Sequence, residues 1–124
     1  MIKLVYCIRR REDVEPGRFR RYWLEQHGPL VRDVASAIGA SRYVQSHTIE
    51  PALNDMLRAS RGAAAAYDGI TEVWWKDRAA LERGLSDPAG IEAARRLLED
   101  EATFIDLAAS CLFLTEEFEI FAFP

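Results

Sequence analysis

The sequence predicts an α+β domain in which helices cover one face of an antiparallel sheet, and three observations support this prediction. The chain has 124 residues, a length typical of one domain with its own hydrophobic core. Its first segment, Ile2 to Ile8, alternates at a period of two, as strands do. From Arg18 onward the apolar residues recur at helical spacing instead. No internal repeat or linker divides residues 1–124, so one domain is expected.

The first predicted helix carries a helix-breaking pair near its middle. Gly28-Pro29 should break or kink it, because proline clashes with the preceding turn and donates no backbone hydrogen bond. We therefore predict a helix to about Gln26, a kink at 27–29, and a second helical piece to about Ile38. Gly39 is positioned to end that second piece.

The rest of the chain alternates between strand and helix patterns. Residues 41–50 are rich in β-branched and aromatic side chains, and residues 70–75 alternate, so both segments are predicted strands. Proline or aspartate marks the start of each remaining helix. The predicted helices run from Pro51 to Arg61, from Asp77 to Arg83 and onward from Asp87-Pro88, followed by a connector over 104–109 and a last strand over 111–123.

This order of elements predicts the split β-α-β arrangement of the ferredoxin-like fold, with a four-stranded antiparallel sheet. One face of such a sheet stays uncovered by helices. The chain has more large apolar side chains than the helix side can cover, including Val5, Tyr43, Trp74, Phe113 and Phe121. A monomer rarely exposes so large an apolar patch, so we expect two chains to pack sheet against sheet as a homodimer.

Charge and hydropathy exclude several classes of protein. Sixteen Lys and Arg against 20 Asp and Glu give a net charge of -4, which argues against a nucleic-acid partner. No apolar run approaches the roughly 20 residues of a membrane span, and the first residues lack the order of a signal peptide. We therefore expect a cytoplasmic domain with no membrane partner. In this topology Cys7 and Cys111 approach each other, and two buried free thiols are favoured over a strained disulfide.

His27 is the first candidate for chemistry. It stands at the predicted helix kink, where irregular backbone can direct a side chain into a cleft, and its ordinary pKa near 6.5 suits proton transfer. The alternative is a structural histidine that hydrogen-bonds at a helix end. The chain contains no phosphate loop, dinucleotide motif or metal-ligand spacing, so we expect no cofactor and no metal.

Three hydrogen-bonding side chains alternate along the second predicted strand. Tyr43, Gln45 and His47 share one face of residues 41–50, where a core face would be aliphatic. This pattern is typical of a surface that faces a ligand. An edge strand whose polar face meets solvent would give the same pattern, and the spacing does not separate the two.

Glu72 lies between apolar residues on one face of the third predicted strand. A lone buried carboxylate is costly, so it should find a partner or have a raised pKa. It either pairs with an arginine such as Arg42 or acts as a second acid/base group. Trp74 and Trp75 point to opposite faces of the strand, so one packs on the helices and the other lines the far face. Trp23 is more typical of a core than of a ligand contact.

Four motifs occur in order along the chain and together resemble the EthD family. They are Phe19-x-x-Tyr22-Trp23-x-x-x-His27-Gly28-Pro29-Leu30-Val31, then Arg42-Tyr43-Val44-Gln45-Ser46-His47, then Tyr67-Asp68-Gly69-Ile70-x-Glu72-x-Trp74, then Phe104-Ile105-Asp106. The resemblance covers most of the chain. Residues 116–120 match the family least well, and residues 62–66 carry no motif.

The resemblance implies a ferredoxin-like subunit within a dimeric α/β barrel. The family is named for a protein that accompanies a cytochrome system in ether degradation, and its members are often described as oxidoreductase-associated. Related proteins include muconolactone methylisomerases and fungal proteins of aromatic polyketide pathways. The resemblance implies that His27 lies in the cleft between helix and sheet and acts as an acid/base. Tyr43 and His47 match cleft-lining positions.

The leading hypothesis is an isomerase- or lyase-type enzyme that acts on a small cyclic or aromatic carbonyl compound by cofactor-independent proton transfer. A lactone or polyketide would be such a compound. The predicted catalytic residues are His27, Tyr43 and His47, and the predicted substrate-binding residues are Tyr22, Gln45, Glu72 and Trp74. A rival hypothesis is an accessory protein that delivers a hydrophobic substrate to a separate monooxygenase. A third is a monooxygenase that uses oxygen or haem.

Overall fold

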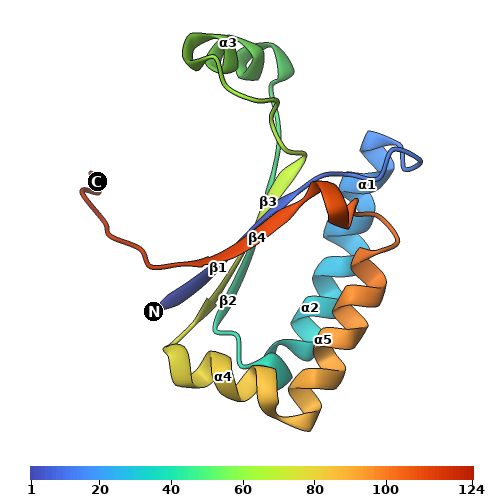
Figure 1. Cartoon of the computed structure of the whole chain (residues 1–124), viewed down its shortest axis with the longest axis vertical. Coiled ribbons are helices and arrows are strands. Elements are labelled where there is room, and N and C mark those ends of the chain that lie inside the picture. The colour runs from blue at the N-terminus through green and yellow to red at the C-terminus, as the bar shows by residue number, and fades with distance from the viewer.

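Four antiparallel strands form one sheet, and helices cover one of its faces in the computed structural model, which describes all 124 residues (Figure 1). The strands run in the order β2-β3-β1-β4, so the first and last strands are neighbours. This is the predicted ferredoxin-like α+β fold. The strands are β1 (Ile2–Ile8), β2 (Arg42–His47), β3 (Gly69–Trp75) and β4 (Cys111–Thr115).

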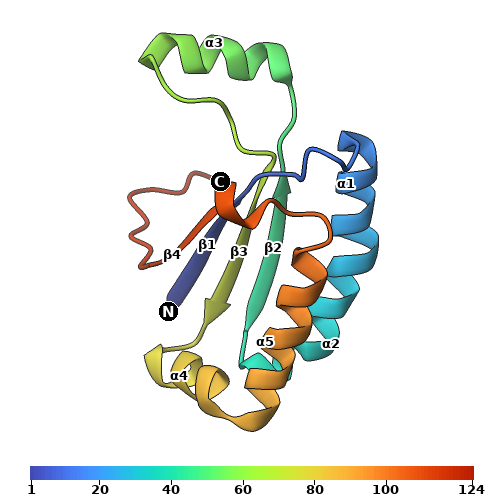
Figure 2. The same cartoon turned by 45° about the vertical axis from the view of Figure 1, so that its right-hand side comes forward.

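The helical layer lies against a single face of the sheet. Helices α2 (Gly28–Ile38) and α5 (Pro88–Glu101) run side by side across it, with α1 (Pro16–Tyr22) and η1 (Trp23–His27) continuing into α2 (Figure 2). Helix α4 (Arg78–Ser86) follows β3 and is capped by Asp77, which accepts from the Ala80 N–H as predicted. None of the helices is long and apolar enough to cross a membrane.

The helix does not break at residues 27–29, where a break or kink was predicted, because His27 and Gly28 keep helical backbone angles. The helix continues from α1 to α2 through one π-helical segment, η1, in which the Gly28 N–H bonds the Trp23 carbonyl. A π-helical turn holds an extra residue, and here it ends just before Pro29, so the proline enters at the start of α2 without breaking the chain direction. Gly39 ends α2 in the left-handed conformation, as predicted.

The last strand is shorter than predicted. Pairing with β1 ends at Thr115, and residues 116–124 leave the sheet as an extended arm instead of continuing as a strand to 123. Glu117 holds the base of this arm, because its carboxylate accepts from the Trp74 indole N–H. Helix α3 (Pro51–Arg61), predicted from Pro51 onward, has no buried residue and projects from the body of the molecule (Figure 1).

Strand register decides which side chains share a face. Val5 pairs with Glu72 and with Phe113, so these three point to the face without helices, whereas Tyr43 pairs with Val73 on the helix face. Cys7 lies directly opposite Cys111, and both thiols are free. The expectation that both would be buried is wrong: Cys7 is half-buried and Cys111 is exposed, because no helix covers this face.

Candidate functional site

A cavity of about 310 Å³ lies between the helices and the sheet. Its walls are mostly aliphatic and aromatic side chains from β1, β3, α2, α4 and α5. Five polar or ionisable residues share this lining, namely Tyr6, His27, Tyr43, Thr71 and Glu101. A few polar groups in an apolar cavity are typical of a small-molecule site, and the volume is at the lower end of such sites.

His27 is held by a carboxylate from the end of α5. Its Nδ1–H donates to Asp100 Oδ2 at 2.7 Å, and the other oxygen of Asp100 accepts from the Tyr22 hydroxyl. The histidine is only 5% exposed and makes an edge contact with the Phe104 ring. Burial lowers the pKa of His27 below its usual value, and Asp100 opposes this shift. His27 is therefore neutral near pH 7, with Nε2 free to act in the cavity that the ring lines.

The polar face predicted on β2 is a hydrogen-bonded chain that ends in the cavity. His47 Nε2 bonds Gln45 Oε1 at 2.9 Å, and Gln45 Nε2 donates to the Tyr43 hydroxyl at 2.9 Å and to the Trp23 carbonyl at 2.8 Å. Of the three β2 residues, only Tyr43 lines the cavity. Burial raises the pKa of Tyr43, so its hydroxyl keeps its proton. Gln45 and His47 do not line the cavity themselves. They contact Tyr43 and Trp23, which do.

Trp23 lies fully buried between His47 and the cavity. Its ring stacks on His47 with 4.3 Å between centroids, while its Nε1–H has no hydrogen-bond partner. A buried donor left unpaired costs about 1–3 kcal/mol. The ring fits here because Gly69 has no side chain, since a Cβ at that position would lie 2.5 Å from the ring. Trp23 therefore belongs to the core, as predicted, and is also one of the residues that line the cavity.

Two predicted substrate-binding residues lie on the opposite face of the sheet. Glu72 accepts from Lys3 Nζ at 2.7 Å, not from Arg42, and Trp74 is covered by Lys3 and Arg42. Neither lines the cavity, because both point away from the helices. The assignment of Glu72 and Trp74 to the site of His27 is therefore wrong. Tyr22 also lies outside the cavity lining and acts through Asp100.

The sequence analysis missed two ionisable residues of the site, Asp100 and Glu101. They are adjacent at the end of α5, where one holds His27 and the other lines the cavity. One signal was present in the sequence. Consecutive carboxylates at the C-terminal end of a helix are electrostatically unfavourable there, because the helix dipole places negative charge at that end. Acidic residues at this position therefore indicate a role other than stabilising the helix.

Fold and site together define a ferredoxin-like α+β protein with a mostly apolar cavity and a carboxylate-held histidine. A family model described as the EthD domain matches residues 11–108, so the chain belongs to the EthD family. No curated protein has a significantly similar sequence. No three His, Cys, Asp or Glu side chains form a group that could hold a metal ion.

Solved structures with the same fold cover nearly the whole chain. An ethyl tert-butyl ether D (EthD) family protein from Bacillus halodurans C-125 is 16% identical, with a TM-score of 0.64 over 95% of this chain and 99% of its own. A dimeric ferredoxin-like protein from Thermobifida fusca YX is 16% identical, with a TM-score of 0.57 over 92% and 88%. SnoaB, a cofactor-independent oxygenase from Streptomyces nogalater, is 14% identical, with a TM-score of 0.53 over 95% and 93%. At these identities the likeness shows the fold alone.

Proposed function

We propose that this protein is an enzyme that moves protons on a small cyclic or aromatic carbonyl compound, of lactone or polyketide type, without a cofactor. The observation that carries the proposal is the His27–Asp100 pair at the wall of an apolar cavity. The buried histidine is neutral at pH 7, and the carboxylate fixes its tautomer. This arrangement supplies a general base within a mostly apolar site.

In the proposed reaction His27 removes a proton from the carbon next to the carbonyl group. The C–H bond breaks, its proton goes to Nε2, and its electron pair moves toward the carbonyl oxygen. Asp100 keeps Nδ1 protonated and stabilises the imidazolium ion that forms. Tyr22 holds Asp100 in turn and acts as a positioning residue.

One donor is available for the negative oxygen that this step creates. The Tyr43 hydroxyl accepts from Gln45, so its own proton is free to donate to a ligand. A donor fixed in place before the reaction stabilises developing charge without reorganisation. Gln45 positions this donor, and His47 holds Gln45 in turn.

A deuterium-exchange experiment tests this function directly. The probe is 3-cyclohexenone in D₂O, and the readout is the loss of the proton NMR signal at C2, between the carbonyl group and the double bond. Wild type should accelerate this loss over buffer, and His27→Ala should not. Equal exchange by wild type and His27→Ala, with both proteins folded, would show that His27 is not the base.

The second candidate is a non-catalytic binding protein that delivers an apolar substrate to a monooxygenase. The predominantly apolar lining of the cavity favours binding of such a molecule. The same probe separates the two functions. A carrier would be stabilised by 3-cyclohexenone in a thermal melt but would produce no exchange at C2, in wild type or in the variant.

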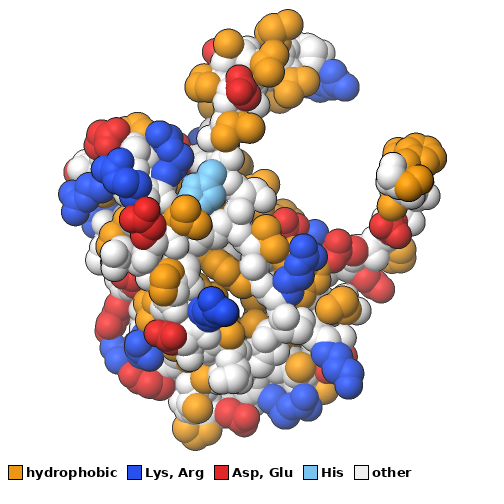
Figure 3. Space-filling view, turned by 180° about the vertical axis from the view of Figure 1, so that it is seen from behind, with side chains coloured by type: hydrophobic (Ala, Val, Ile, Leu, Met, Phe, Trp, Pro, Cys, Tyr) orange, Lys and Arg blue, Asp and Glu red, His pale blue; other side chains and the backbone are white.

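We also propose that two copies associate through the sheet face without helices. Phe113 on this face is 49% exposed, and the arm and α3 carry further exposed apolar side chains on either side of an open gap (Figure 3). The solved relative from Thermobifida fusca is described as dimeric. Sedimentation should give a dimer for wild type and a monomer for Phe113→Asp. Ile91→Asp, on the exposed side of α5, should remain a dimer.

A further inference from the structure

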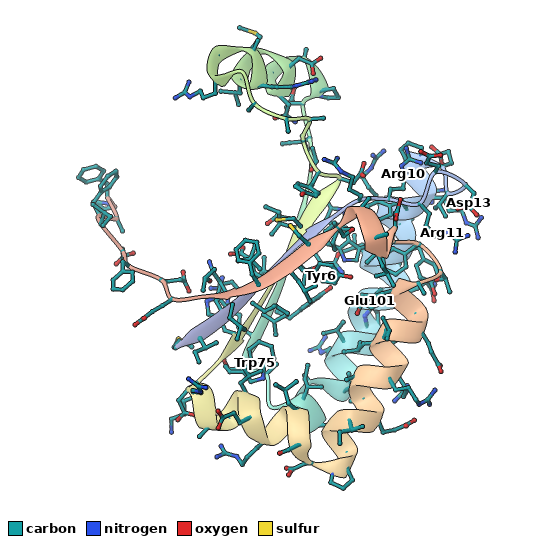
Figure 4. The ribbon with its side chains drawn as sticks, in the orientation of Figure 1. Tyr6, Arg10, Arg11, Asp13, Trp75 and Glu101 are labelled. Carbon is teal, nitrogen blue, oxygen red and sulfur yellow. The ribbon has the colours of Figure 1, made fainter.

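Glu101 is an ionisable group in the cavity that the function proposed above does not use. It is the last residue of α5, one position after Asp100, and its side chain reaches toward the sheet where Tyr6 lies on β1 (Figure 4). Both residues line the cavity. No Lys or Arg forms an ion pair with Glu101, although Lys and Arg form six ion pairs elsewhere in the molecule.

The surroundings of Glu101 leave its carboxyl group balanced between two protonation states. Burial raises its pKa to about 7, the Tyr6 hydroxyl pulls it down in part, and the neighbouring Asp100 adds to the rise. The other titratable groups that border the cavity are His27 from η1 and Tyr43 from β2. The lining contains no Lys or Arg. A carboxyl group in this position can donate a proton at neutral pH and can also accept one.

We propose that Glu101 is a second catalytic residue, which returns a proton to the substrate at a carbon other than the one that His27 deprotonates. The inference rests on the proposed function and narrows it. The substrate class is carbonyl compounds with a carbon–carbon double bond one position removed from conjugation, and the reaction is a shift of that double bond. His27 alone accounts for exchange at the α-carbon, and an acid on a second element of the cavity wall supplies a proton to the γ-carbon from another direction.

The two steps balance in atoms and charge. His27 Nε2 takes a proton from the α-carbon, and the electron pair spreads through the double bond to the carbonyl oxygen. The protonated Glu101 carboxyl group then gives its proton to the γ-carbon, where a new C–H bond forms and the double bond comes into conjugation. His27 is left as imidazolium and Glu101 as carboxylate. A proton passing from one to the other through solvent restores the starting state.

The test compares Glu101→Gln with wild type on 3-cyclohexenone in D₂O and follows two signals. One is loss of the C2 proton, which needs only His27. The other is formation of conjugated 2-cyclohexenone deuterated at C4, which needs both residues. For Glu101→Gln we expect double-bond migration to fall by about 100-fold or more, while C2 exchange persists. Glu99→Gln, an exposed position on the same helix, should match wild type in both.

Different results would refute the role of Glu101 and the proposed function. Unchanged double-bond migration in folded Glu101→Gln would overturn this inference and leave the proposed function intact. No C2 exchange in wild type would instead refute the proposed function itself. A second variant guards against a purely structural effect. In Tyr6→Phe the carboxyl group loses the hydroxyl that lowers its pKa, so the pH above which migration declines should move upward from about 7. An unmoved pH profile would contradict the role of Glu101.

Discussion

Glu72 and Glu101 are the same residue type on opposite faces of one sheet, and their surroundings differ in one respect. Glu72, on the face without helices, has a cation 2.7 Å away in Lys3. Glu101, on the helix face, has a tyrosine and an apolar cavity and no cation. A carboxylate that is paired with a cation has a structural role, whereas an unpaired carboxyl group in an apolar site can change its charge near pH 7. We therefore expect the chemistry on the face that the helices cover. On the other face we expect structural contacts and association between copies.

The largest effect expected on the helix face is that of removing His27. His27→Ala should reduce double-bond migration of 3-cyclohexenone by about 100- to 10,000-fold, the usual contribution of a positioned acid/base group. On the other face, Glu72→Gln should leave the rate within a few-fold of wild type. A comparable loss in both variants would erase the distinction between the two faces.

Removal of the carboxylate that holds His27 should have the next largest effect. Asp100→Asn keeps only one of the two oxygens that accept from Tyr22 and His27, and it loses the negative charge that raises the pKa of His27. We expect a rate loss of about 10- to 100-fold, as for other groups that orient a functional histidine. We also expect the acidic limb of the pH–rate profile to move to lower pH. A rate loss with an unmoved profile would point to a structural role only.

Glu101→Gln and Glu72→Gln should change the free energy of unfolding in opposite directions and with different pH dependence. The pKa of Glu101 is raised from 4.5 to about 7 in the folded protein, so its contribution to stability falls as pH rises between these values. Glu101→Gln should therefore gain stability above pH 7, by at most about 3 kcal/mol, and gain little below pH 4.5. Glu72→Gln should lose stability near pH 7, because Lys3 loses its partner. Urea unfolding at pH 4 and pH 8 measures both.

The close approach of Trp23 to the sheet gives a further, smaller test. Gly69→Ala would place a methyl group 2.5 Å from the indole ring, which we expect to cost about 1–3 kcal/mol and to displace Trp23. Gly28→Ala is the control, because its Cβ would meet only ordinary contacts at 3.5 Å and alanine favours a helix. Thermal melts followed by tryptophan fluorescence should separate the two variants. Equal melting would contradict the proposed packing.

Much of the fold could be predicted because local patterns specify it. The alternation of β1 and β3 and the caps at Asp77 and Gly39 follow from short stretches of sequence, and the strand order follows from the order of the elements along the chain. The β2 pattern left a ligand-facing surface and a solvent-facing edge open, and only the resemblance to the EthD family placed Tyr43 at a cleft. Alternation correctly placed Glu72 and Trp74 on one face, but it does not say which face the helices cover.

The surroundings of His27 could not be predicted, because they depend on contacts distant in sequence. Asp100 lies 73 positions from His27 and reaches it only when α5 packs beside α2. The π-helical turn at η1 was missed for a related reason. Gly28-Pro29 gives the same local signal whether a helix breaks or widens, and packing against the sheet decides between them.

The most direct test of the account is the nitrogen NMR spectrum of the two histidine rings in wild-type protein at pH 7. The account predicts that His27 is neutral, with its proton on Nδ1 and with a bare Nε2 whose signal shifts when 3-cyclohexenone is added. A charged His27, or a neutral one protonated on Nε2, would contradict it, because neither form offers a base to the cavity.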